Sequence, residues 1–425
     1  MHILILVFFI IFLALGIPVA VSMGLTSFLY LFLFMDVSPM VVVQQMISGV
    51  NKFTLLAIPF FMLSGAYMEH GGISKRIVRF CNSLFGSLPG GLAIVMVVAS
   101  VIFAAMTGSG VATCAAVGGI MFPIMKQEGY DEDFYCGLQS VAGILGPLIP
   151  PSILLVLYGV AVNISVSDLL MGGLVPGLFL GFLYIVLTVF ICKTKKIGNQ
   201  GTKFSVKEVG ESFLHAIGAL LVPGIILGGI YSGFCTATEA AALAALYSLI
   251  VGVFFYKEMT IKEAVKITLE QMKQMGGLTI IVAAANAFAW VMTREQIPQK
   301  IAGALISVSS SKLVFMALVA LLVLFVGCFM DATPSVLLLA PILAPVATEY
   351  GVDPIHFAIF LVTGVLIGLA TPPVGANLFA VSSMTGRPLQ KFVPYVLPYL
   401  AVTVIGLIII GVFPAFSTWL PNMVK

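Results

Sequence analysis

Long apolar runs separated by short polar stretches make up most of the 425-residue chain, and residues 3–34 contain no charged residue. A helix of about 20 apolar residues spans the hydrocarbon layer of a bilayer. Such runs lie at about 53–68, 88–106, 168–192, 213–232, 236–256, 275–292, 312–328 and 393–417. We expect about 10–12 membrane spans, because 2–35 and 213–256 each fit one long segment or two short ones. The pattern predicts an all-α polytopic membrane protein.

Two polar interruptions of this pattern are copies of one another, 222 positions apart (368 − 146). The first joins the tip Thr107-Gly108-Ser109-Gly110 to the break 146–151, and the second joins the tip 331–335 to the break 368–373. Glycine disfavours a helix interior by about 1 kcal/mol and proline by about 3 kcal/mol. We therefore expect re-entrant hairpins at 107–127 and 329–350 and broken helices at 131–166 and 354–386, although ordinary kinks or loops are an alternative.

The duplication divides the chain into two structural repeats. We expect the first repeat at 1–192, a linker at 193–211 and the second repeat at 212–425. Scaffold spans are expected at 1–70 and 213–292, and an amphipathic arm helix at 260–273, which matches 36–50. By the positive-inside rule the linker is cytoplasmic, since it carries Lys193, Lys195, Lys196, Lys203 and Lys207.

Composition supports a membrane protein and excludes several functions. The chain is 60% hydrophobic and only 9% charged, whereas soluble domains carry about 25% charged residues. The net charge of +3 is scattered, which argues against nucleic-acid binding. No Gly-Lys dipeptide occurs, so a phosphate-binding loop for ATP is excluded. The six cysteines lack CxxC spacing and are expected to be mostly small buried apolar residues.

The tips and breaks supply oxygen atoms suited to a hard monovalent cation. A helix break frees backbone carbonyls, and the tips add hydroxyls and the carboxylate of Asp331. Carboxylates and histidines are otherwise scarce in the spans, which favours sodium over protons. An alternative role for Asp331 is to cap the second helix of its hairpin. The predicted sodium-binding residues are Thr107, Ser109, Gly146, Pro147, Asp331, Thr333, Gly368 and Thr371.

Half-helix N-termini at the breaks would direct positive dipole ends into a shared cavity, which suits an anionic substrate. Paired broken segments in two halves mark a transporter's binding site. For Asn377 the alternative is an amide that satisfies local backbone, and Glu239 is expected to serve a helix start. The predicted substrate-binding residues are Gly108, Gly110, Pro150, Ser152, Ser335, Pro372 and Asn377.

Several of these motifs resemble the large membrane subunit of tripartite ATP-independent periplasmic (TRAP) transporters. The resemblance rests on Thr-Glu-Ala-Ala-Ala at 238–242, Gly-Ser-Gly at 108–110, Gly-Pro-Leu-Ile-Pro-Pro-Ser at 146–152 and Ala-Thr-Pro-Pro-Val-Gly at 370–375. It implies an inverted-repeat elevator in the bacterial inner membrane, with Na⁺ as the coupling ion. It also implies two partners, a small four-span membrane subunit and a periplasmic substrate-binding protein.

The substrates that the resemblance implies are organic acids. They include sialic acid, C4-dicarboxylates and other sugar and keto acids; we favour sialic acid on general likeness, and no single residue decides. One alternative is a stand-alone sodium–dicarboxylate symporter. A membrane channel or membrane-embedded enzyme is disfavoured, because the sequence shows neither a continuous polar pore nor a nucleophile–base pair.

Overall fold

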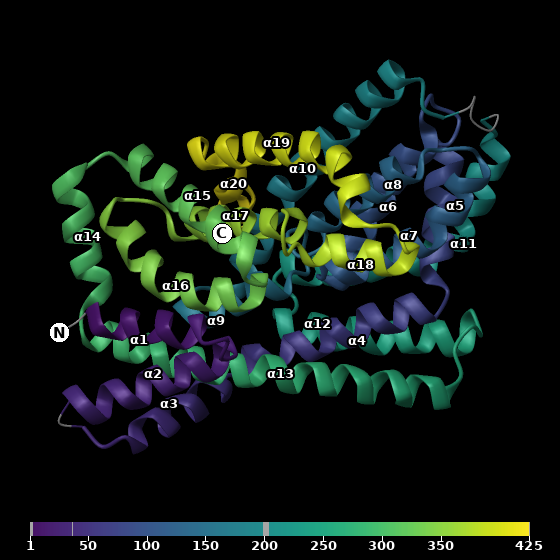
Figure 1. The fold of residues 1–425 in the computed structure, drawn as a ribbon. Coiled ribbons are helices and arrows are strands. Elements are labelled where there is room, and N and C mark those ends of the chain that lie inside the picture. Colours follow the sequence, from purple (N-terminus) through teal and green to yellow (C-terminus); the bar gives the residue numbers. More distant parts are fainter. Residues whose placement is uncertain (1–2, 36, 199–203, 425) are drawn as a thin grey trace.

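The computed structural model describes residues 3–35, 37–198 and 204–424, and within them the chain is helical (Figure 1). The first half begins with α1 (Ile3–Ala14), α2 (Val19–Phe34), α3 (Met40–Val50), α4 (Ala57–His70) and α5 (Ile73–Phe85). It continues with α6 (Gly91–Thr107), α7 (Gly110–Gln127), α8 (Glu132–Ala142), α9 (Ile153–Val162) and α10 (Val166–Lys195).

The second half repeats this order. It begins with α11 (Val206–Tyr231), α12 (Ala237–Ile250), α13 (Ile261–Arg294), α14 (Ile297–Val308) and α15 (Lys312–Phe329). It ends with α16 (Ala332–Glu349), α17 (Pro354–Ile367), α18 (Ala376–Thr385), α19 (Leu389–Val412) and α20 (Ala415–Val424). Helix α13 corresponds to α3 and α4 together.

Contacts between the halves are reciprocal, as expected when two copies pack about a pseudo-two-fold axis. Helix α7 packs on α18, and its counterpart α16 packs on α9. In Figure 1, α6 and α7 lie on one side of the molecule and α15 and α16 on the other, while α13 runs along the lower edge. The two hairpins therefore approach the centre from opposite sides.

Each hairpin is longer than its predicted range. The ranges 107–127 and 329–350 each contain one helix rather than two, and the first arm of each hairpin is the preceding apolar helix, α6 or α15. The polar tip thus stands at the start of each range rather than at its centre. Gly108 ends α6 in the left-handed region (φ +61°), and the extended Ser109 begins α7.

The broken helices lie where the prolines predict them. After α8, a 3₁₀ turn at Gly143–Leu145 leads into irregular chain that ends at Ser152, the N-cap of α9. After α17, a 3₁₀ turn at Gly368–Ala370 leads into irregular chain before α18. Both Pro-Pro peptide bonds are cis. The sequence prediction of paired breaks is confirmed.

The predicted arm helix at 260–273 is helical, but it forms one continuous helix, α13, with the next predicted span. A capping box between Thr260 and Glu263 starts the helix, and Gly276-Gly277 lies inside it without interrupting it. The first copy does bend: Met40–Val50 and Phe53–His70 meet at 56°. There the backbone of Lys52 is extended (φ −118°, ψ 125°), which ends the helical path.

Seven helices of the described chain are long and apolar enough to cross a membrane, and the bent pair at 40–70 would make an eighth. Five shorter apolar helices add halves of hairpins, broken helices and the N-terminal pair, so the predicted count of 10–12 includes short segments. The run 2–35 forms two helices, as does 213–256. The linker is shorter than predicted, since α10 extends to Lys195; Lys203 lies outside the described residues.

The remaining small predictions concern cysteines and a helix start. All six cysteines are free thiols, four of them buried. Thr236 and Glu239 form a capping box at the start of α12, in which the Thr236 backbone N–H donates to Glu239 Oε2 at 2.8 Å. Both predictions are confirmed, and neither group belongs to the cavity described next.

Candidate functional site

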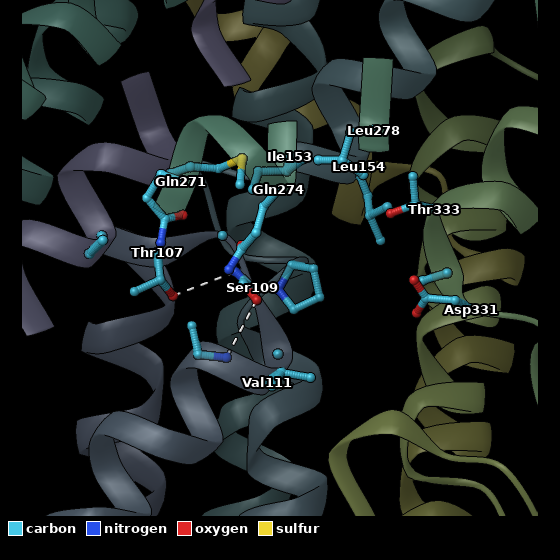
Figure 2. Close-up of a pocket in the computed structure, with 18 of the residues that line it drawn as sticks. Thr107, Ser109, Val111, Ile153, Leu154, Gln271, Gln274, Leu278, Asp331 and Thr333 are labelled. Carbon is cyan, nitrogen blue, oxygen red and sulfur yellow. Dashed lines mark hydrogen bonds between the residues drawn. The ribbon is translucent and has the colours of Figure 1, made fainter. Parts of the chain in front are cut away.

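A cavity of about 680 Å³ lies between the two hairpin tips and is closed on another side by α4 and α13. Figure 2 shows Thr107 and Ser109 on one wall and Asp331 and Thr333 facing them from the other hairpin. The volume falls within the range of about 300–1,000 Å³ that is usual for small-molecule sites. The tips predicted from the duplication therefore meet at one site.

Backbone geometry fixes the first tip. Gly108 lies so close to the first break that a Cβ there would be 2.4 Å from the Pro151 carbonyl oxygen, so only glycine fits. Ser109 Oγ caps α7 by accepting from the Ala112 N–H at 3.4 Å. Thr113 Oγ1 donates to the Ser109 carbonyl at 2.8 Å. These contacts hold the tip hydroxyls at the wall of the cavity.

The second tip has the same backbone arrangement as the first but carries a carboxylate in place of a hydroxyl. Asp331 stands where Ser109 does in the first copy (331 − 109 = 222), and Ser335 Oγ donates to its carbonyl at 2.8 Å, as Thr113 does to Ser109. Asp331 occupies the N-cap position of α16, yet its side chain makes no capping hydrogen bond. The expectation that its carboxylate caps the helix is therefore wrong, and the exposed carboxylate faces the cavity.

The predicted site residues divide into two groups. Those that line the cavity are Thr107, Gly108, Ser109, Gly110, Pro147, Asp331 and Thr333. Those that do not are Gly146, Pro150, Ser152, Ser335, Gly368, Thr371, Pro372 and Asn377. The polar members of the second group are engaged elsewhere: Ser152 donates to the Pro147 carbonyl, and Thr371 Oγ1 donates to the Ile367 carbonyl at 2.7 Å.

Asn377 lies behind the first tip rather than in the cavity wall. Its Nδ2 donates to the Ser140 carbonyl at 3.0 Å, while its buried Oδ1 has no hydrogen-bond partner among the described residues. Gly110 and Gly143 flank this amide so closely that a Cβ on either would be 2.8 Å from one of its atoms. An unpaired buried oxygen is unfavourable unless a further group satisfies it.

The breaks and the hairpins touch through glycines in both copies. A Cβ on Gly146 would lie 2.6 Å from the Ser109 carbonyl and 2.8 Å from Thr113 Oγ1. A Cβ on Gly368 would lie 2.2 Å from the Gly327 carbonyl. Each broken helix thus brings its backbone against a hairpin, so oxygens of the two elements gather behind the first tip.

The sequence reasoning missed the wall formed by α4 and α13. Helix α13 presents a stripe at helical spacing that starts with Gln271 and Gln274 and continues with Leu278 and Ile281. Helix α4 adds Glu69 at the polar end of its own stripe. The only signal in the sequence was this spacing of polar residues within apolar helices, which does not say what they face.

The cavity has an acidic rather than a basic wall. Among the described residues that line it, Glu69 and Asp331 are the ionisable ones, and none is a lysine, arginine or histidine. Among the described residues no three His, Cys, Asp or Glu side chains are grouped as for a transition metal. Recognition of an anion here would depend on backbone N–H groups, hydroxyls and amides.

Comparison with known proteins decides the family. The profile of the family described as "Tripartite ATP-independent periplasmic transporter, DctM component" matches residues 6–416. The chain belongs to this family. It is a TRAP transporter large permease subunit, a multi-pass protein of the bacterial inner membrane, and the family is one of transporter permeases rather than enzymes.

Two relatives differ in the substrate that their names give. The C4-dicarboxylate TRAP transporter large permease protein DctM of Pseudomonas aeruginosa is 45% identical over 372 residues, covering 88% of this chain and 87% of the relative. The sialic acid TRAP transporter large permease protein SiaM of Vibrio cholerae is 39% identical over 380 residues, covering 89% of each.

Among solved structures, the YdaH transporter of Alcanivorax borkumensis superposes with a TM-score of 0.66 at 15% identity, covering 89% of this chain and 88% of that one. The TRAP subunit thus shares its fold with a transporter of very different sequence.

Proposed function

We propose that this TRAP subunit carries an organic acid into the cell, driven by a sodium gradient. The observation that carries the proposal is the meeting of Ser109 and Asp331, equivalent positions of two copies, on opposite walls of one cavity. Half-helix N-termini, hydroxyls and an exposed carboxylate around a cavity between two repeats are typical of a coupled transporter.

The oxygens behind the first tip support sodium as the coupling ion. The orphaned Asn377 Oδ1 lies beside Gly110, and the Ser109 carbonyl and Thr113 Oγ1 crowd Gly146. An uncharged set of carbonyl, amide and hydroxyl oxygens suits Na⁺. On the second side, Asp331 supplies a full negative charge that favours a cation over an anion at that tip.

We propose an elevator mechanism in which the hairpins and broken helices move together against α4 and α13. The reciprocal packing of α7 on α18 and of α16 on α9 supports it, since each hairpin holds the opposite half's broken helix. The proposed partners are a small membrane subunit and a periplasmic binding protein, in the lipid of the inner membrane.

The substrate class is an organic acid anion, and both relatives' names give candidates. Sialic acid, which the sequence favours, and a C4-dicarboxylate, which the 45% identical relative's name gives, are the two candidates. The test is uptake of labelled succinate and labelled sialic acid into proteoliposomes that contain this chain and its small partner. We expect uptake only with an inward sodium gradient and a binding protein; uptake without the binding protein would support a stand-alone symporter instead.

Two substitutions test the ion sites. Asp331→Asn and Ser109→Ala are each expected to raise the sodium concentration for half-maximal uptake at least about tenfold, as for loss of an interaction with an ionised group. The matched controls cap helices away from the cavity: Asp353→Asn on α17 and Ser165→Ala on α10. Wild-type sodium dependence in both test variants would refute these ion sites.

A further inference from the structure

The scaffold-side wall of the cavity contains two side-chain amides that face the first tip. Gln271 and Gln274 stand three residues apart on α13, so their Cα atoms are separated by about 4.5 Å along the helix axis. Both line the cavity, and Figure 2 shows them on the α13 side, with Thr107 and Ser109 across from them. Neither amide hydrogen-bonds to another described residue, and Gln274 is exposed to the cavity space.

The charges around the cavity determine what these two amides can bind. Glu69 and Asp331 repel an anion, and no basic side chain of the described part of the chain lines the wall. A substrate whose carboxylate is held at the N-terminus of α7 avoids these two carboxylates when its other polar groups lie toward α13. There the lining offers amide N–H donors at Gln271 and Gln274, followed by the apolar Leu278.

We propose that Gln271 and Gln274 are specificity-determining residues that hydrogen-bond the end of the organic acid remote from the first tip. The inference rests on the proposed function and deepens it. Two neutral amides can donate to a second carboxylate or exchange hydrogen bonds with hydroxyls, whereas a substrate with an apolar end leaves them unpaired. A substrate that fills the cavity excludes water from these amides, so an analogue without the partner group leaves them unpaired and is discriminated against.

The test compares substrates rather than activity alone. Gln271→Leu and Gln274→Leu keep side-chain bulk and helix propensity but remove the amide. The matched control is Thr279→Val on the same helix, whose hydroxyl bonds to the Met275 carbonyl and does not line the cavity. Apparent KM values for succinate and sialic acid are measured in proteoliposomes with the partner subunit and binding protein.

We expect the apparent KM of the preferred substrate to rise about tenfold, the ratio of the two substrates' kcat/KM to change by a similar factor, and half-maximal sodium to stay constant. Because Thr279→Val remains wild-type, general damage to α13 is excluded. If a leucine variant fails to assemble, Gln271→Met and Gln274→Met replace it as the test variants. An unchanged substrate ratio in the variants, with active wild-type protein, overturns the inference; wild-type protein that transports no organic acid instead overturns the proposed function.

Discussion

Lys52 forms a bridge between the bend of the first arm and the end of a broken helix. Its Nζ donates to the Val160 carbonyl at 2.7 Å and to Asn163 Oδ1 at 2.9 Å. Val160 belongs to the last turn of α9, where carbonyls lack partners within the helix and the dipole is negative. Asn163 ends that helix in the left-handed conformation (φ 58°). An ammonium group placed there should hold the C-terminus of α9 closed.

The expected magnitude follows from these two bonds. A hydrogen bond to a charged group contributes about 1.5–3 kcal/mol. The exposed bond to Asn163 adds little to stability, and the part-buried bond to Val160 is taken at the lower end of the range, so the total is about 1.5 kcal/mol. Lys52→Met keeps the aliphatic stem and removes both bonds. Opening of this helix end should then become about tenfold more favourable.

Hydrogen exchange provides the assay. The N–H groups of Asn163 and Ile164 both donate to the Gly159 carbonyl, so they report on the closed helix end. We expect their protection factors to fall about tenfold in Lys52→Met. Lys75→Met is the control, because the Lys75 side chain is 73% exposed. Its Nζ lies as far as 3.9 Å from Glu258 Oε2, so its removal also deletes a charge but breaks no short hydrogen bond.

Unchanged protection at Asn163 and Ile164 in Lys52→Met would refute the reasoning. A fall of equal size in Lys75→Met would show a general effect of lost charge. If the elevator proposal holds, the bridge also joins the arm to a moving element, so its removal should change the uptake rate at saturating substrate.

Two further predictions concern packing and an ion pair. Gly368→Ala should destabilise the fold by about 1–3 kcal/mol, seen as a lower melting temperature, because its Cβ would meet a backbone carbonyl at 2.2 Å; Gly224→Ala, with open space around it, should not. A hydrogen bond from Lys126, aided by Arg387, holds the pKa of Glu132 below its usual 4.5. The resulting stability is present above pH 4.5 and is lost as pH falls through the lowered pKa, so Arg387→Ala should weaken that acid dependence in thermal melts.

The repeated glycines and prolines correctly predicted the tips and breaks at the centre of the fold. These residue types disfavour a helix interior, so their positions can be read from the sequence. Gly146 and Gly368 mark the starts of two real breaks, and the tips at Ser109 and Asp331 do meet. The lengths of the hairpins were not predictable in the same way. Nothing in the local pattern says whether an apolar run beside a tip is a separate span or the first arm of the hairpin.

The α13 wall could not be predicted for a different reason. Gly276-Gly277 inside an amphipathic run normally favours a helix end, yet α13 continues through these two exposed glycines. Helix propensity is a weak prior of about 1 kcal/mol per glycine, and α13 packs on α2, α3, α4 and α16 elsewhere along its length. Gln271 and Gln274 line the cavity only because α13 is continuous, since a bend at the glycines would turn these side chains away from Leu278 and Ile281.

The two copies therefore share a backbone frame and differ in the charge of their tips. Ser109 and Asp331 occupy equivalent places, but only one carries a charge. Upstream of the tips the copies match with a shift of 224, which places Met68 on Met292 and Lys52 on Gly276 (276 − 52). Among the described residues, the copy with lysine bends and bridges to a broken helix, whereas α13 does not bend there. Had both tips carried carboxylates, an anionic substrate would meet repulsion on each side of the cavity. In the proposed mechanism, the uncharged first tip leaves the α7 N-terminus able to hold the anion, while the oxygens behind that tip and the Asp331 carboxylate hold cations.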